Sequence, residues 1–153
     1  MTDFLTDPKT ASWMSVEELN ANGGPLSQKM GIRFTEVGTE IGNQRVVATM
    51  PVEGNTQPYG ILHGGASVVL AESVGSMLAV LLAGEGRAAV GMTINAIHHR
   101  PASSGTVTAV ATALQAGRTT ASVAIAITDD QGRRVCSCTL LCQLRDAPPT
   151  QRA

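Results

Sequence analysis

The chain has 153 residues, of which 43% are hydrophobic, 15% are charged and 3% are aromatic, and its net charge is −1. This near-neutral charge and the few aromatic side chains argue against a nucleic-acid-binding surface. A charged fraction well below the usual value of about a quarter suggests that other subunits cover part of the surface. We expect a single domain over residues 1–153, with its core at about residues 25–145 and loose ends.

The N-terminal part predicts a short helix followed by strands. Ser15 and Glu18 have the spacing of a capping box, which begins a helix that we expect to end near Gly23 and Gly24. Residues 1–12 lack the basic start and apolar run of a secretory signal. Two strands are predicted at residues 32–37 and 44–52, on either side of a turn at 38–42. The second of them alternates only partly between polar and apolar residues.

A long apolar helix is predicted after the loop at residues 53–58. From Ala66 to Ala83 its only ionisable residue is Glu72. The length is near the minimum for a membrane span, but the segment contains an acid and several serines and has no basic or aromatic anchors. We therefore expect a core helix and no membrane. An acid in such a segment is costly to desolvate, so Glu72 is expected to be paired, protonated or used in chemistry.

The rest of the chain reads as strands at hairpin spacing. They are predicted at residues 88–100, 106–114, 119–128 and 134–144, with a reverse turn at Asp129–Gly132. No helix separates these strands, so the sheet should be antiparallel. A helix that is apolar almost all round must be covered on several sides. We predict an α+β fold in which a curved antiparallel sheet wraps around one long central helix.

The three cysteines, Cys136, Cys138 and Cys142, lie on one face of the last predicted strand. The outer two are about 20 Å apart at roughly 3.3 Å per residue, which is too far to share one metal ion. Strand neighbours two residues apart are poorly placed for a disulfide. We expect buried thiols in a reducing cytoplasm and no metal site.

Several motifs fall in register along the chain. They are Gln57-Pro-Tyr-Gly60, His63-Gly-Gly65, Glu72 followed by Ser76, Asn95-Ala-Ile-His98-His-Arg100, Gly117-Arg-Thr-Thr120 and the closing Asp-Gln-Gly-Arg hairpin. This set resembles the hotdog-fold acyl-CoA thioesterases, in particular the branch of phenylacetate-pathway and 4-hydroxybenzoyl-CoA thioesterases. The resemblance implies the hotdog fold and the hydrolysis of an acyl-CoA to a free acid and coenzyme A.

The resemblance also implies catalytic roles. The Gly64 N–H, helped by the Gln57 side chain, would polarise the thioester carbonyl. Glu72 would act as nucleophile or as general base on water, and both routes are open to a carboxylate. Ser76, one helical turn later, would hold the carboxylate or the water. His63 would orient the loop or lie near the thiol leaving group.

Helix geometry favours a site shared between two subunits. Glycines at a helix N-terminus let a ligand approach free N–H groups. Glu72 lies eight residues beyond Gly64, which is about 12 Å along a helix at roughly 1.5 Å per residue. One thioester carbon cannot touch both groups of one chain. We therefore expect Glu72 to come from a neighbouring subunit, in a dimer or in a dimer of dimers that makes a homotetramer.

Coenzyme A carries phosphates that attract cations. Gly65, His98, Arg100, Arg118 and Thr119 fall on positions that the family uses around the substrate and its nucleotide. His98 and Arg100, two residues apart on a predicted strand, should share one face, and His99 should point away. No cofactor is expected, because coenzyme A is part of the substrate.

The acyl group is expected to be small, and aromatic or of medium chain length, lying on aliphatic side chains such as Leu62, Val69 and Met77. An alternative is a non-catalytic acyl-CoA-binding or regulatory hotdog domain, which would not need Glu72. A hotdog hydratase would use a His and Asp pair, yet no aspartate lies between Asp7 and Asp129, which argues against it.

Overall fold

The computed structural model describes residues 14–38, 40 and 42–146. The expected loose N-terminal residues 1–12 lie outside the described residues, as do two positions of the predicted turn at 38–42. The C-terminal tail is expected to begin after residue 144, but Arg145 and Asp146 still belong to the last strand, and the rest of the tail lies outside the described residues. In chain order the elements are α1 (Val16–Ala21), α2 (Gly24–Met30), β1 (Arg33–Gly38), β2 (Arg45–Pro51), α3 (Gly64–Ala83), β3 (Arg87–His98), β4 (Thr106–Ala116), β5 (Thr120–Thr128) and β6 (Arg134–Asp146).

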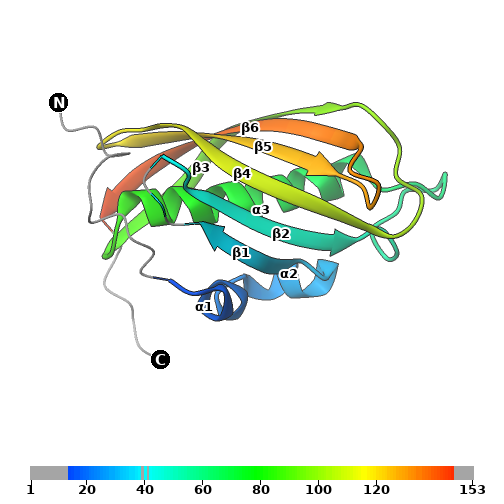
Figure 1. The fold of residues 1–153 in the computed structure, drawn as a ribbon, viewed down its shortest axis with the longest axis horizontal. Helices are drawn as coiled ribbons and strands as arrows, with labels where there is room; N and C mark the ends of the chain where they lie inside the picture. The colour runs from blue at the N-terminus through cyan, green and yellow to red at the C-terminus, as the bar shows by residue number, and fades with distance from the viewer. Residues whose placement is uncertain (1–13, 39, 41, 147–153) are drawn as a thin grey trace.

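One antiparallel sheet curves around α3 (Figure 1). Its six strands have the order β1-β2-β4-β5-β6-β3. The chain passes from β2 through α3 to β3 on the far edge, and then returns through three hairpin-connected strands to fill the gap. The helix packs against β2, β3, β4, β5 and β6. The predicted α+β hotdog arrangement is confirmed.

Buried and half-exposed residues alternate in β2 more regularly than its polar and apolar residues do. In β2, Val46, Ala48 and Met50 are buried against the helix, and the residues between them are half-exposed. The pattern looks partial in the sequence because Val47, an apolar residue, lies on the outer face of the sheet. Side-chain direction in a strand is set by the pleat and not by polarity.

Two helices stand where the sequence predicts one. The capping box at Ser15 is present, but α1 ends at Ala21 and α2 begins at Gly24. Pro25 lies in the first turn of α2, where its missing N–H and fixed φ suit a helix start. Gly31, with φ of 71°, ends α2 in the left-handed conformation. The Gly23-Gly24-Pro25 segment is therefore a junction between helices and not the end of helical structure.

The central helix lies close to the sheet because Gly75 has no side chain. A Cβ atom built there would be 2.7 Å from Leu140 Cδ2 and 3.2 Å from Ile125 Cδ1. By length and hydropathy α3 would also pass as a membrane span, but 56% of that window is buried inside the fold. This burial is typical of a core helix.

The prediction of buried, unpaired cysteines is confirmed. Cys136 and Cys138 point toward α3 from one face of β6, with their Sγ atoms 3.6 Å apart. Cys142 lies further along the same face.

Candidate active site

The N-terminus of α3 leaves one backbone N–H group free. His63 is the N-cap, and its Nδ1 atom accepts a hydrogen bond of 2.8 Å from the Gly65 N–H. The N–H groups of Ala66 and Ser67 donate to the His63 carbonyl at 2.9 and 3.3 Å. Among the hydrogen bonds of the described residues, the Gly64 N–H has no acceptor. It is thus the donor of this turn that a ligand can use.

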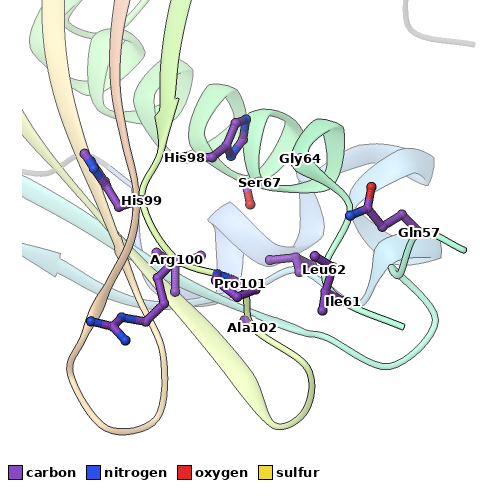
Figure 2. Close-up of a pocket in the computed structure, with 11 residues that line it drawn as sticks. Gln57, Ile61, Leu62, Gly64, Ser67, His98, His99, Arg100, Pro101 and Ala102 are labelled. Atoms are coloured by element: carbon purple, nitrogen blue, oxygen red, sulfur yellow. The ribbon is translucent and has the colours of Figure 1, made fainter. Parts of the chain in front are cut away.

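A cavity of about 450 Å³, which we call the helix-end pocket, lies at this N-terminus. Gln57, Gly64 and Ser67 line it from the helix and the preceding loop, and His98, His99 and Arg100 from the end of β3 (Figure 2). Its apolar lining is Ile61, Leu62, Pro101, Ala102 and Val135. Four of the predicted site residues, namely Gln57, Gly64, His98 and Arg100, therefore meet in one pocket.

The imidazole of His98 lies against Gly64. A Cβ atom at Gly64 would be 3.1 Å from His98 Nε2 and 3.2 Å from Cε1, so a larger residue would push the ring away. This packing gives Gly64 a second reason to be glycine, beside the approach of a ligand to its N–H group.

The prediction that His98 and Arg100 share a strand face is wrong. The strand ends at His98, and the N–H groups of His99 and Arg100 both donate to the Val135 carbonyl, at 2.8 and 3.4 Å. The two-residue alternation stops there. Figure 2 shows His98 beside α3 and Arg100 pointing away from it, while His99 Nε2 lies 2.9 Å from Ser137 Oγ. All three still line the pocket.

Glu72 belongs to a second cavity, of about 350 Å³, which we call the helix-side groove. It shares this groove with Ser73 and Ser76 of α3 and with apolar side chains of α2, β1 and α3, namely Leu26, Phe34, Val69 and Met77. Ser73 Oγ donates to the Val69 carbonyl at 2.8 Å, so its hydroxyl proton is used within the helix. Ser76 lies on the face of Glu72, as predicted.

The chain by itself does not desolvate Glu72, because this residue is exposed although the segment around it is apolar. The sheet covers other faces of α3 and leaves the Glu72 face open beside the edge strand β3. The carboxylate lies against Gly91 of that strand.

Sequence reasoning missed two residues that line or border these cavities. Ser67 is 2% exposed and lines the helix-end pocket; its position one helical turn after Gly64 was a signal that it shares that face. Cys142 borders Ser76 and Glu72: burial raises the pKa of its thiol, a hydrogen bond with Ser76 lowers it, and the charge of Glu72 raises it. No sequence signal brings β6 to this point of α3.

Two predicted coenzyme A ligands lie elsewhere in the chain. Arg118 and Thr119 are exposed in the turn between β4 and β5. Thr120 and Val90 both pair with Gln143, so this turn lies where β3 begins, and His98 lies where β3 ends. Gly65 adjoins the helix-end pocket, but its N–H donates to His63 Nδ1.

Within residues 14–38, 40 and 42–146, no group of three or more His, Cys, Asp or Glu side chains is arranged to hold a metal ion.

The chain is similar to known proteins along most of its length. Residues 59–136 match the model of a protein family described as the thioesterase superfamily. The chain is 44% identical over 126 residues to the proofreading thioesterase EntH of Cronobacter turicensis, a match that covers 81% of this chain and 89% of that protein.

Solved structures agree. The thioesterase HI1161 of Haemophilus influenzae has a TM-score of 0.83 and 35% identity, covering 91% of this chain and 96% of that one. A variant of the thioesterase PA1618 of Pseudomonas aeruginosa has a TM-score of 0.82 and 39% identity, covering 88% and 96%. The chain therefore belongs to the thioesterase superfamily and is a thioester hydrolase with the hotdog fold.

Proposed function

We propose that the protein is an acyl-CoA thioesterase whose active site forms between two subunits. The observation that carries this proposal is the free Gly64 N–H, which faces a pocket beside Gln57, while the exposed carboxylate of Glu72 lies in a different cavity of the same chain. The N–H group and the Gln57 amide polarise the thioester carbonyl, and the helix dipole favours the developing oxyanion. Glu72 of the partner subunit attacks the carbonyl carbon or removes a proton from water.

The two edges of the sheet differ in a way that supports pairing of two copies. At the β1 edge, the Asn20 side chain donates a hydrogen bond to the Phe34 carbonyl and accepts one from the Phe34 N–H, both at 2.9 Å. These backbone groups are therefore already bonded and cannot pair with another strand. The β3 edge exposes Val90, Met92 and Ile97 and has no charged residue between Arg87 and His98. An edge strand without charged residues is ready to pair with another strand.

A two-fold axis at this edge would join the separate half-sites. In β3 the inward-facing Gly91 adjoins Glu72, the inward-facing His98 adjoins Gly64, and Met92 is the extra residue of a bulge. If β3 pairs antiparallel with its own copy at Asn95, Gly91 opposes the partner's His98. Glu72 then lies next to the helix-end pocket of the other chain. In this register the opposed residues Gly91 and His98 both face inward, as pairing in one sheet requires.

The same symmetry accounts for the remaining predicted ligands. The turn with Arg118 and Thr119 lies where β3 begins, so in the antiparallel pair it approaches the end of the partner's β3. The coenzyme A phosphates would then meet Arg100 of one chain and Arg118 and Thr119 of the other. Ser76 holds the carboxylate or the water, and His63 holds the first turn of α3.

The helix-side groove supports an apolar acyl group. Leu26, Phe34, Val69 and Met77 line it beside Glu72, whereas Leu62 lines the helix-end pocket. This lining suits a small aromatic or medium-chain acyl group. The proofreading thioesterase among the relatives suggests thioesters on carrier proteins as further substrates to test.

The proposal is tested by thiol release from benzoyl, hydroxybenzoyl, phenylacetyl and straight-chain acyl-CoAs and from acyl carrier proteins. We expect Glu72→Ala to lower kcat on the order of 10³-fold, the size of a lost acid–base or nucleophilic group. Activity retained in Glu72→Ala, or tight binding without hydrolysis in the wild-type protein, would reject the catalytic role in favour of a binding domain.

Complementation tests whether the site is shared. Glu72→Ala chains and Gln57→Ala chains are each impaired alone. Refolded together, half of the dimers are mixed and hold one complete site, so about a quarter of wild-type activity should return. No recovery in verified mixed dimers would show that each chain contains its own site.

A further inference from the structure

The carboxylate of Glu72 occupies the space where Gly91 lacks a side chain. A Cβ atom built on Gly91 lies 2.8 Å from Glu72 Oε1 and 3.7 Å from Glu72 Cδ; its next neighbour, Leu140 Cδ1, is 3.7 Å away, an ordinary contact. Glu72 is thus the neighbour with which a side chain at position 91 would collide.

The backbone itself does not require glycine at this position. Gly91 is not among the residues with positive φ, and it pairs with Cys142 within β3 and β6. A glycine inside a strand weakens the strand, so its presence calls for a reason. The room that it gives to the Glu72 carboxylate is such a reason.

A second neighbour of the carboxylate is the thiol of Cys142. Cys142, opposite Gly91, is fully buried and borders Ser76 and Glu72. Burial raises the pKa of this thiol, which keeps it neutral, so no second negative charge competes with the carboxylate. The bulge at Met92 follows Gly91 directly, and bulges change the direction in which a strand presents its side chains.

We propose that Gly91 is a positioning residue for thioester hydrolysis: its bare Cα lets the Glu72 carboxylate lie flat on the edge strand, at the place where the partner's pocket meets it. This inference rests on the catalytic role proposed for Glu72. A side chain at position 91 displaces the carboxylate outward and leaves the fold in place, because the colliding atom is the end of a flexible side chain.

The test is Gly91→Ala. We expect kcat to fall by about 10- to 100-fold, as for a reacting group displaced by roughly 1 Å, with KM within about threefold of wild type. The melting temperature and the molar mass in solution should stay those of wild type. Ser122→Thr is the matched control: it also adds one methyl group to a strand residue, but Ser122 is half-exposed on β5 and lines neither cavity.

Gly91→Ala in a protein that also carries Glu72→Asp separates a loss of carboxylate positioning from a general effect of the added methyl group. Glu72→Asp withdraws the carboxylate by about one C–C bond, roughly 1.5 Å, so the added methyl group no longer meets it. In this background we expect Gly91→Ala to cost less than twofold in kcat.

Three results would overturn the inference: full activity in Gly91→Ala, an equal loss of kcat in both backgrounds, or a loss of oligomer in Gly91→Ala. None of them is a result that rejects the proposed function, namely an active Glu72→Ala protein or tight binding without hydrolysis in the wild-type protein. The two failures are therefore distinguishable.

Discussion

Three glycines of this protein are defined by the side chain that each one admits. Gly64 admits the imidazole of His98, Gly75 admits Leu140, and Gly91 admits the carboxylate of Glu72. None of the three has a positive φ, so the backbone would accept other residues. Their role is space: one glycine positions a ring, one allows the helix to approach the sheet, and one provides a place for the candidate catalytic acid.

Cys138 is expected to make stability fall at alkaline pH. Burial, and then the charge and hydrogen bond of Cys136, raise the pKa of its thiol from 9.0 to about 12. Because the folded-state pKa lies above the unfolded one, the stabilising effect is complete below pH 9 and is lost as the pH rises toward 12. The free energy of unfolding should fall by about 1.4 kcal/mol per pH unit for such a thiol.

Urea unfolding in reducing buffer between pH 8 and about 10.5 measures this slope. Cys138→Ala lowers stability by a constant amount for the lost packing, but its slope should be shallower than that of wild type by the contribution of one thiol. Parallel slopes would contradict the prediction.

At the scale of elements, α3 combines the core of the fold with the candidate site. Its buried face packs on the sheet, and its N-terminus lines the helix-end pocket. Glu72, eight residues after Gly64, lines the helix-side groove. The first turn is fixed by the His63 cap, which binds the Gly65 N–H and so leaves the Gly64 N–H for a ligand. Histidine is an unusual N-cap, since Ser, Thr, Asp and Asn are preferred.

We expect His63 to act through this cap. His63→Ala should lower the free energy of unfolding by about 1 kcal/mol and lower kcat, because the first turn frays. His63→Asn, which keeps a capping acceptor, should restore the stability and raise kcat well above that of the alanine variant. Thermal melts and steady-state kinetics of both proteins measure this. A stable asparagine variant as slow as the alanine variant would instead indicate direct contact between His63 and the substrate.

At the scale of the whole molecule, the surfaces without charged residues are those where we expect other subunits to bind. The β3 edge has no charged residue between Arg87 and His98, and the outward residues of the central strands β4 and β5 are Thr, Ser, Ala, Val, Leu and Gln, without a charge. Solvated sheet faces usually carry charged side chains. We expect the β3 edge to form the catalytic dimer and this outer face to join two dimers into the tetramer.

Asn95→Lys tests the first interface. The proposed two-fold axis places Asn95 against its own copy, so two ammonium groups would meet at an edge that pairs through its backbone. We expect the dimer to dissociate and thiol release to be lost while the far-UV circular dichroism persists. Thr112→Lys, an exposed outward position on β4, is the matched control; it should keep the active dimer and weaken only the tetramer. An active Asn95→Lys monomer, shown by light scattering, would contradict the shared site.

The predicted strands agree with the structure to within two residues at each end, because alternation and turn residues are local properties. The sequence predicted one helix where the structure has α1 and α2, and the reason is also local. Glycine is typical of a helix end and proline of a helix start, and in Gly23-Gly24-Pro25 the two signals are adjacent. The motifs singled out Gln57, Gly64 and His98 as candidate site residues, and the structure places all three in one pocket. The motifs missed Ser67, although helical spacing placed it on the face of Gly64.

The sequence by itself determined the order of the elements and the antiparallel sheet around one helix, because these depend on periodicity and turn chemistry. The candidate site residues came from motifs that resemble those of a known family. Only the tertiary structure decided that Glu72 is exposed, that it rests on Gly91, and that Cys142 lies beside it. Those contacts join α3 to strands that come after it in the chain, and no local pattern records which residue of β3 or β6 faces which residue of the helix.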